Sequence, residues 1–218
     1  MKRQLFAVLV LCSASAAFAQ TPRPAAPKPQ GPPPLFFKET WKDGPGNVPM
    51  TQDGVVNPEL QLTMLTTTKE DFGITAEGGV PHIWTGLCAN TCALMLSSKT
   101  NYVDLTGKAK IRWYTKVSGF HVVRPALRLA DGTLLVGDHT DANLLDYLQS
   151  EFFPSEVKWM KMDAKVQTKG TLLDKVDLSK VDAVGFADLT PGSGHGSGGY
   201  SDVGWIEVYG KPVPRDTK

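Results

Sequence analysis

The chain has 218 residues, of which 41% are hydrophobic and 21% are charged, and its formal net charge is +1 at pH 7. Basic and acidic side chains are almost evenly balanced, which disfavours a nucleic-acid partner because such a partner requires a basic stripe. The length beyond the amino-terminal segments suits one domain of β-sandwich size with an adequate hydrophobic core.

The first 19 residues have the three parts of a secretory signal peptide. Two basic residues precede an apolar run from Leu5 to Phe18, and the small residues Ala17 and Ala19 mark a cleavage site. The run is short for a transmembrane helix, which needs about 20 apolar residues, and no other stretch is apolar enough to span a bilayer. We therefore expect a secreted or periplasmic mature chain that begins near Gln20. Loss of two basic residues leaves 21 against 22 acidic ones, so its formal charge is −1.

Residues 20–34 are expected to form a proline-rich linker. Seven of the sixteen prolines lie between Thr21 and Pro34, and this stretch has no large apolar residue to bury. It is expected to be extended, in the polyproline conformation. Such a segment is either a spacer that holds the domain away from a membrane, wall or partner, or a disordered leader.

Short strand-like runs follow one another through residues 35–212, which we expect to be the folded domain, with residues 213–218 as a tail. The expected strands lie at 35–41, 57–66, 82–86, 92–97, 110–117, 123–129, 133–136, 157–162, 183–187 and 203–209. Residues 71–79, with three glycines, are expected to be a loop. Either a short helix or an irregular loop is expected to begin at Asp141. This pattern predicts an all-β, antiparallel β-sandwich of the jelly-roll kind, with at most one short helix.

The stretch from residue 101 to residue 138 is the clearest part of this pattern. Ile111 and Trp113 alternate with Arg112 and Tyr114, as in a strand with one buried face and one wetter face. Asp131 and the glycine after it predict a two-residue hairpin turn, because a left-handed backbone costs least at these residue types.

Two segments near the carboxyl terminus resemble galactose-binding-like jelly-roll domains, which include non-catalytic carbohydrate-binding modules. They are VDLSKVDAVGF at 176–186 and SDVGWIEVYG at 201–210, and residues 107–138 fit the preceding core strands. The resemblance implies two antiparallel sheets with sugars bound at edge loops or on a concave face. The resemblance also implies that a structural calcium is possible. The sequence has no clear signature for a calcium site, so calcium binding stays open and no other cofactor is expected.

Sugar binding needs an aromatic ring to stack on a pyranose and polar groups to bond its hydroxyls. The candidate rings are Trp84, Trp159 and Tyr200, and the candidate polar partners are Arg124, Arg128, Asp138, His139 and His195. Arg124 and Arg128 share a strand face and precede Asp138, whereas His195 lies in a glycine-rich loop. The alternatives are that Trp84 and Trp159 belong to the core and that the arginines are solvated or salt-bridged. Trp113 and Trp205 are expected in the core.

The cysteine count changes on export, because only Cys88 and Cys92 remain once Cys12 leaves with the signal peptide. In an oxidising compartment these two residues are expected to form a structural disulfide, with reduced thiols as the alternative. A zinc site would need a further ligand pair at matching spacing, which the sequence lacks.

The sequence therefore favours a secreted, non-catalytic β-sandwich module that binds carbohydrate or a cell-envelope partner. It contains no HExxH, no nucleophile elbow and no phosphate-binding loop. The alternatives are a glycan-processing enzyme, similar to glycoside hydrolases, that uses a carboxylate and histidine cluster near Asp138, and a purely structural module.

Overall fold

The computed structural model describes residues 31–44, 48–66, 72–85, 88, 92–119, 121–141, 144–162, 171–189 and 199–215. The described residues from Pro32 onward form one compact unit. The expected signal peptide and most of the expected linker lie outside the described residues. Within the described ranges, no helix has the length and apolar character needed to cross a membrane.

Strands account for most of the described chain. They are β1 (Leu35–Glu39), β2 (Val48–Pro49), β3 (Leu60–Leu65), β4 (Gly73–Glu77), β5 (Val80–Trp84), β6 (Cys92–Ser98), β7 (Asn101–Asp104), β8 (Lys110–Gly119), β9 (Val123–Leu129), β10 (Leu134–Gly137), β11 (Leu148–Phe152), β12 (Trp159–Lys161), β13 (Thr171–Leu172), β14 (Val181–Asp188), β15 (Gly199–Tyr209) and β16 (Lys211–Pro214). A single 3-10 turn, η1 (Gln52–Gly54), lies between β2 and β3.

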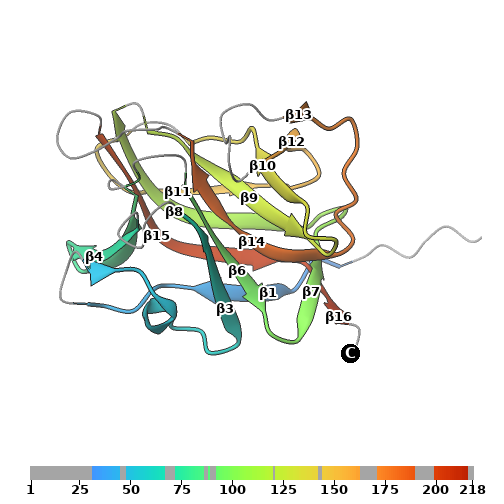
Figure 1. The fold of residues 1–218 in the computed structure, drawn as a ribbon, viewed down its shortest axis with the longest axis horizontal. Helices are drawn as coiled ribbons and strands as arrows, with labels where there is room; N and C mark the ends of the chain where they lie inside the picture. Colours follow the sequence, from blue (N-terminus) through green and yellow to red (C-terminus); the bar gives the residue numbers. More distant parts are fainter. Residues whose placement is uncertain are drawn as a thin grey trace, which may run out of the picture. The chain divides into compact units, whose positions relative to one another are not determined.

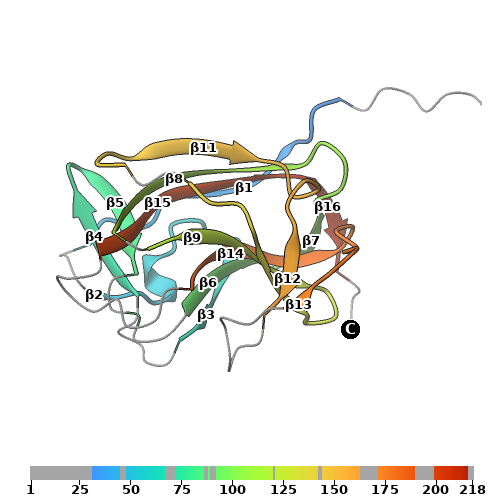
Figure 2. The same cartoon turned by 90° about the horizontal axis from the view of Figure 1, so that it is seen from above.

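The strands form two antiparallel sheets packed as two layers (Figures 1 and 2). Sheet A has the order β11-β8-β15-β5-β4-β2, with β1 also paired to β15. Sheet B has the order β13-β12-β10-β9-β14-β6-β3, with β7 paired to β14 and β16 paired to β7. This arrangement confirms the expected all-β, antiparallel β-sandwich of the jelly-roll kind.

The strand pattern read from residues 110–117 is confirmed in β8. Ile111, Trp113 and Val117 are buried between the sheets, and the alternate residues lie on the outer face of sheet A. The hairpin after β9 also forms, but its connection runs from residue 130 to residue 133 and is longer than a two-residue turn. Asp131 stabilises this connection because its carboxylate accepts the backbone N–H of Thr133 at 2.8 Å.

Three expectations for the loops differ from the structure. Residues 73–77, expected to be loop, form β4, because Gly78 and Gly79 both adopt positive φ and so close a tight hairpin to β5. After Asp141 the described residues 144–147 are loop and β11 follows, so the helix option is wrong. The carboxyl-terminal segment pairs with β7 through β16, which extends to Pro214.

A buried carboxylate joins the two sheets at one end of the sandwich. Asp188, at the end of β14 in sheet B, is fully buried. Its Oδ2 accepts hydrogen bonds from Thr85 Oγ1 at 2.9 Å and from Ser201 Oγ at 3.2 Å. Thr85 directly follows β5, and Ser201 lies in β15, so both donors come from the side of sheet A. The imidazole of His121 contacts the same oxygen through Nδ1. The disulfide Cys88–Cys92 forms beside this cluster, since Cys92 pairs with Asp188 in the sheet register.

A second buried carboxylate fixes the segment after β1. Glu39 is 1% exposed, and its two oxygens accept four backbone N–H groups at 2.8–3.2 Å. Two of these donors are Trp41 and Val56, which come from different parts of the chain. Charge-assisted bonds of this kind are roughly twice as strong as neutral ones, so Glu39 holds this irregular segment against the sandwich.

Replacing Glu39 with Gln should lower the free energy of unfolding by about 3 kcal/mol, because an amide nitrogen would then face backbone donors. Urea denaturation followed by tryptophan fluorescence measures the change. The exposed Glu59→Gln variant is the matched control and should stay within about 0.5 kcal/mol of the parent. An unchanged midpoint for Glu39→Gln would contradict this role.

Candidate functional site

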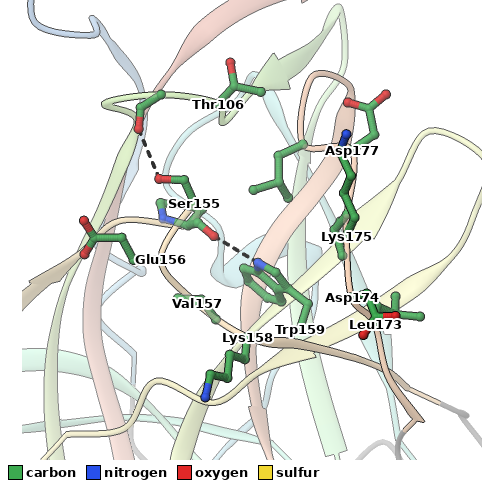
Figure 3. Close-up of a pocket in the computed structure, with 14 residues that line it drawn as sticks. Thr106, Ser155, Glu156, Val157, Lys158, Trp159, Leu173, Asp174, Lys175 and Asp177 are labelled. Carbon is green, nitrogen blue, oxygen red and sulfur yellow. Dashed lines mark hydrogen bonds between the residues drawn. The ribbon is translucent and has the colours of Figure 1, made fainter.

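Three loops enclose the candidate site, a cleft of about 690 Å³ (Figure 3). They are the links β7–β8, β11–β12 and β13–β14. The residues that line the cleft are Thr106, Gly107, Pro154, Ser155, Glu156, Val157, Lys158, Trp159, Leu173, Asp174, Lys175, Val176, Asp177 and Leu178. Its volume lies within the range of roughly 300–1,000 Å³ that is usual for small-molecule sites.

Hydrogen bonds between the loops hold the cleft open in one shape. Ser155 Oγ donates to the carbonyl of Gly107 at 3.1 Å and so joins the β11–β12 link to the β7–β8 link. The backbone N–H of Leu173 donates to the carbonyl of Trp159 at 3.0 Å, and that of Leu105 donates to Leu178 at 2.9 Å. All three links are therefore connected to one another.

The floor of the cleft is largely apolar. Trp159 is 3% exposed, and its indole N–H donates to the carbonyl of Pro154 at 3.0 Å (Figure 3). Leu178 is buried beside it, and Val157 and Val176 are half-buried. Trp159, named from the sequence as a candidate ring, thus lies at the site but contributes a buried surface and not an open ring face.

Charged side chains of both signs surround this floor. One wall carries Glu156 and Lys158, and the opposite wall carries Asp174, Lys175 and Asp177. The first four of these side chains have no hydrogen bond or ion pair within the part of the chain that the structure describes. The Ser179 hydroxyl and backbone N–H hold the pKa of Asp177 below its ordinary value. Three carboxylates face two ammonium groups, so the formal charge of the rim is −1.

The two arginines named from the sequence lie on the outer face of sheet B. Arg128 forms an ion pair with Asp182, which also pairs with Arg215 at 2.6 Å. Arg124 Nη1 lies 3.5 Å from the carbonyl of Gly137. Arg128 is therefore salt-bridged, as the alternative interpretation expected, whereas Arg124 lies near Gly137 at the end of β10.

Asp138 borders the cleft, because its carboxylate accepts the backbone N–H of the rim residue Lys158 at 2.9 Å. The other candidates do not join it. Trp84 belongs to β5 in sheet A, His139 packs on Phe152 with ring centroids 4.1 Å apart, and the ring of Tyr200 and all of His195 lie outside the described residues. The structure thus brings Asp138 and Trp159 to one region but does not gather the whole predicted set.

His139 and Asp141 form a separate pair next to the core tryptophan. Asp141 Oδ2 accepts the indole N–H of Trp113 at 2.6 Å and the hydroxyl of Thr115 at 2.7 Å, and Oδ1 lies 3.4 Å from His139 Nε2. Burial acts to raise the pKa of Asp141, but the interactions with His139 and Thr115 outweigh it and hold the pKa below its ordinary value. The ionised carboxylate therefore anchors the loop that precedes β11.

Asp141 should make stability depend on pH in the acid range. A carboxylate with a lower pKa in the folded chain stabilises the fold above its unfolded pKa of about 3.9. This contribution is lost as the pH falls through the folded pKa. Asp141→Asn should therefore be less stable at neutral pH and lose less stability on acidification, as measured by urea denaturation at a series of pH values. The exposed Asp146→Asn variant should keep the parental profile, and a parental profile in Asp141→Asn would disprove the assignment.

On the outer face of sheet A the charged side chains form ion pairs, unlike those at the rim of the cleft. Glu207 pairs with Lys38 at 2.9 Å and with Arg112 at 3.2 Å, and Glu151 pairs with Lys110 at 2.8 Å. These pairs run across β1, β15, β8 and β11. Each of these charges is balanced by a neighbour, so this face does not offer the unpaired groups that the cleft does.

Trp205 lies on this outer face, which corrects its expected place in the core. The register of β15 against β8 shifts between Val203 and Trp205, and this β-bulge turns Trp205 outward while Ile206 is buried. Its ring stacks on Tyr114 with centroids 5.7 Å apart, and Tyr114 stacks on Tyr147 at 4.8 Å. These ring faces pack against one another, so the row reinforces the sheet and is not a free stacking platform.

Among the described residues, no group of three or more His, Cys, Asp or Glu side chains is placed to hold a metal ion.

No protein-family model and no curated protein matches the sequence. Several solved structures are similar to parts of this chain, with TM-scores below 0.5. A family 11 carbohydrate-binding module from Clostridium thermocellum, in complex with a β-1,3-1,4-mixed-linked tetrasaccharide, is 14% identical over 82% of this chain and 98% of its own, with a TM-score of 0.44. The same family's module from cellulosomal cellulase Lic26A-Cel5E of C. thermocellum is 13% identical over 74% of this chain and 88% of its own, with a TM-score of 0.42.

An agarase is 10% identical, with a TM-score of 0.40; the match covers 77% of this chain and 25% of the agarase chain. At these identities and TM-scores the function has to be argued from the residues of this chain.

Proposed function

We propose that this chain is an exported, non-catalytic module that binds a carbohydrate chain in the cleft between its three loops. The observation that carries the proposal is the unpaired, mixed-sign rim above an apolar floor. A sugar has hydroxyls that both donate and accept hydrogen bonds, and its ring carbons present an apolar face. Lys158 and Lys175 offer donors, and Glu156 and Asp174 offer acceptors, on opposite walls.

The fixed shape of the cleft supports the same proposal. Sugars bind weakly when a site must first be ordered, because each immobilised side chain or loop costs free energy. Here the three links are already hydrogen-bonded to one another through Ser155, Leu173 and Leu105. Little of the free energy of binding is then needed to order the loops, so most of the hydrogen-bonding free energy contributes to affinity.

A Lys158→Ala, Asp174→Ala double variant should bind its glycan at least about ten-fold more weakly, because two charge-assisted hydrogen bonds are lost. Calorimetric titration with soluble oligosaccharides that the parent binds measures this loss. The matched control is Glu59→Ala, Lys180→Ala, which removes one charge of each sign from exposed positions outside the cleft lining. If the cleft variant binds with the affinity of the parent, the glycan binds outside this cleft. If the folded parent binds no glycan at millimolar concentration, carbohydrate binding is refuted.

The export signal and the linker belong to this proposal. Cleavage near Gln20 would leave the proline-rich residues 20–34 ahead of the domain, as a spacer between it and a component of the cell envelope. Mass spectrometry of the protein recovered from the periplasm or medium should give a mature chain that begins near Gln20. An intact amino terminus in a cytoplasmic fraction would contradict export.

The glycan-processing alternative remains a prediction with its own test. Asp138 is engaged with the backbone of Lys158, and His139 is packed on Phe152 and Asp141. An enzyme that used this cluster would release reducing ends from a polysaccharide, and Asp138→Asn would abolish the release. Binding without any release of reducing ends by the parent would remove this alternative.

A further inference from the structure

The charges of the cleft are distributed unequally, and this bears on which sugars the proposed site would take. Lys175 extends alongside Asp177, and its charge is one of the factors that lower the pKa of Asp177 (Figure 3). Together these two residues contribute no net formal charge. The remaining charges are the ammonium of Lys158 and the carboxylates of Glu156 and Asp174, and their formal sum is −1.

The two carboxylates lie on different walls, on either side of the apolar floor. Glu156 belongs to the β11–β12 link and Asp174 to the β13–β14 link. A ligand that spans the cleft above Trp159 therefore meets an acceptor with negative charge at each edge. Hydroxyl groups satisfy these acceptors, but a protonated amine satisfies them with a charge-assisted bond and neutralises the excess negative charge.

We infer that the cleft prefers a glycan that carries free amino groups, such as a glucosamine polymer, over the neutral glycan with the same backbone. This inference rests on the proposed function, because it names the chemical class of ligand for the same cleft. Glu156 and Asp174 are the residues that set the preference. Acidic glycans are disfavoured for the same reason, since their carboxylates would meet three carboxylates on the rim.

Three hexasaccharides with one β-1,4 backbone provide a sharp test: cellohexaose, the N-acetylglucosamine hexamer and the glucosamine hexamer. They differ at the second carbon, which carries a hydroxyl, an acetamide or an ammonium group. Titration at a pH that keeps the amines protonated should give tighter binding of the glucosamine hexamer by about five-fold or more at low salt, the factor that roughly 1 kcal/mol provides. High salt should reduce the difference because it screens exposed charges.

Variants then assign the preference to the two carboxylates. Glu156→Gln, Asp174→Asn keeps the shape of both side chains and removes their negative charge, so it should bind the three hexamers with similar affinity. The control Glu59→Gln, Asp146→Asn removes the same charge at exposed positions outside the cleft lining and should retain the preference. Equal or weaker binding of the glucosamine hexamer by the parent, or a preference that survives in the cleft variant, would overturn the inference.

The two proposals fail in different ways. Cellohexaose or the N-acetylglucosamine hexamer bound as tightly as the glucosamine hexamer leaves carbohydrate binding intact and removes the preference for amines. No binding of any glycan, with the fold intact by circular dichroism, removes both.

Discussion

The buried carboxylate of Asp188 is the interaction on which the geometry of the sandwich depends. A polar group with no exposure to water is costly to bury unless it is hydrogen-bonded, and here Oδ2 accepts hydrogen bonds from Thr85 and Ser201 and contacts His121. Because these donors belong to sheet A or to the link before β9, the carboxylate sets how the two layers meet at this end. The cleft lies beyond the opposite end of β14, where the links before β8, β12 and β14 come together. Between these two ends, Val181, Val184 and Phe186 of β14 pack in the hydrophobic core.

Much of the fold could be predicted because β-strands record their burial in alternate residues. The pattern in β8 specifies which side chains are inside, and it holds for Ile111 and Trp113. The same reasoning failed at Trp205, since a β-bulge adds one residue to a strand and reverses the faces beyond it. A bulge leaves little signal in a single sequence apart from Gly204, which is one of 21 glycines in the chain. The strand β4 was missed for a related reason, because its turn glycines gave the whole segment the composition of a loop.

The candidate site was harder to predict than the fold, because it depends on which charges remain unpaired. Arg128 and Lys158 are equivalent in sequence terms, as basic residues near strand ends. Asp182, which lies 54 residues from Arg128, neutralises it, whereas no described side chain does the same for Lys158. Trp159 could be named from residue type, but its burial follows from the loop that folds over it. The charged links at 154–158 and 174–177 carried a usable signal, since each combines acidic and basic residues next to an apolar strand.

The connected walls of the cleft also bear on the speed of recognition. Association that waits for a loop to order is limited by that rearrangement, whereas a site with its final shape already formed captures ligand at a rate set mainly by diffusion and orientation. The bonds of Ser155 to Gly107 and of Leu173 to Trp159 place this cleft in the second group. Weak binding would then arise from rapid escape of the ligand, and a polymer with many equivalent segments would be released and recaptured repeatedly. Such a module would move along a polysaccharide surface while it stays associated with it.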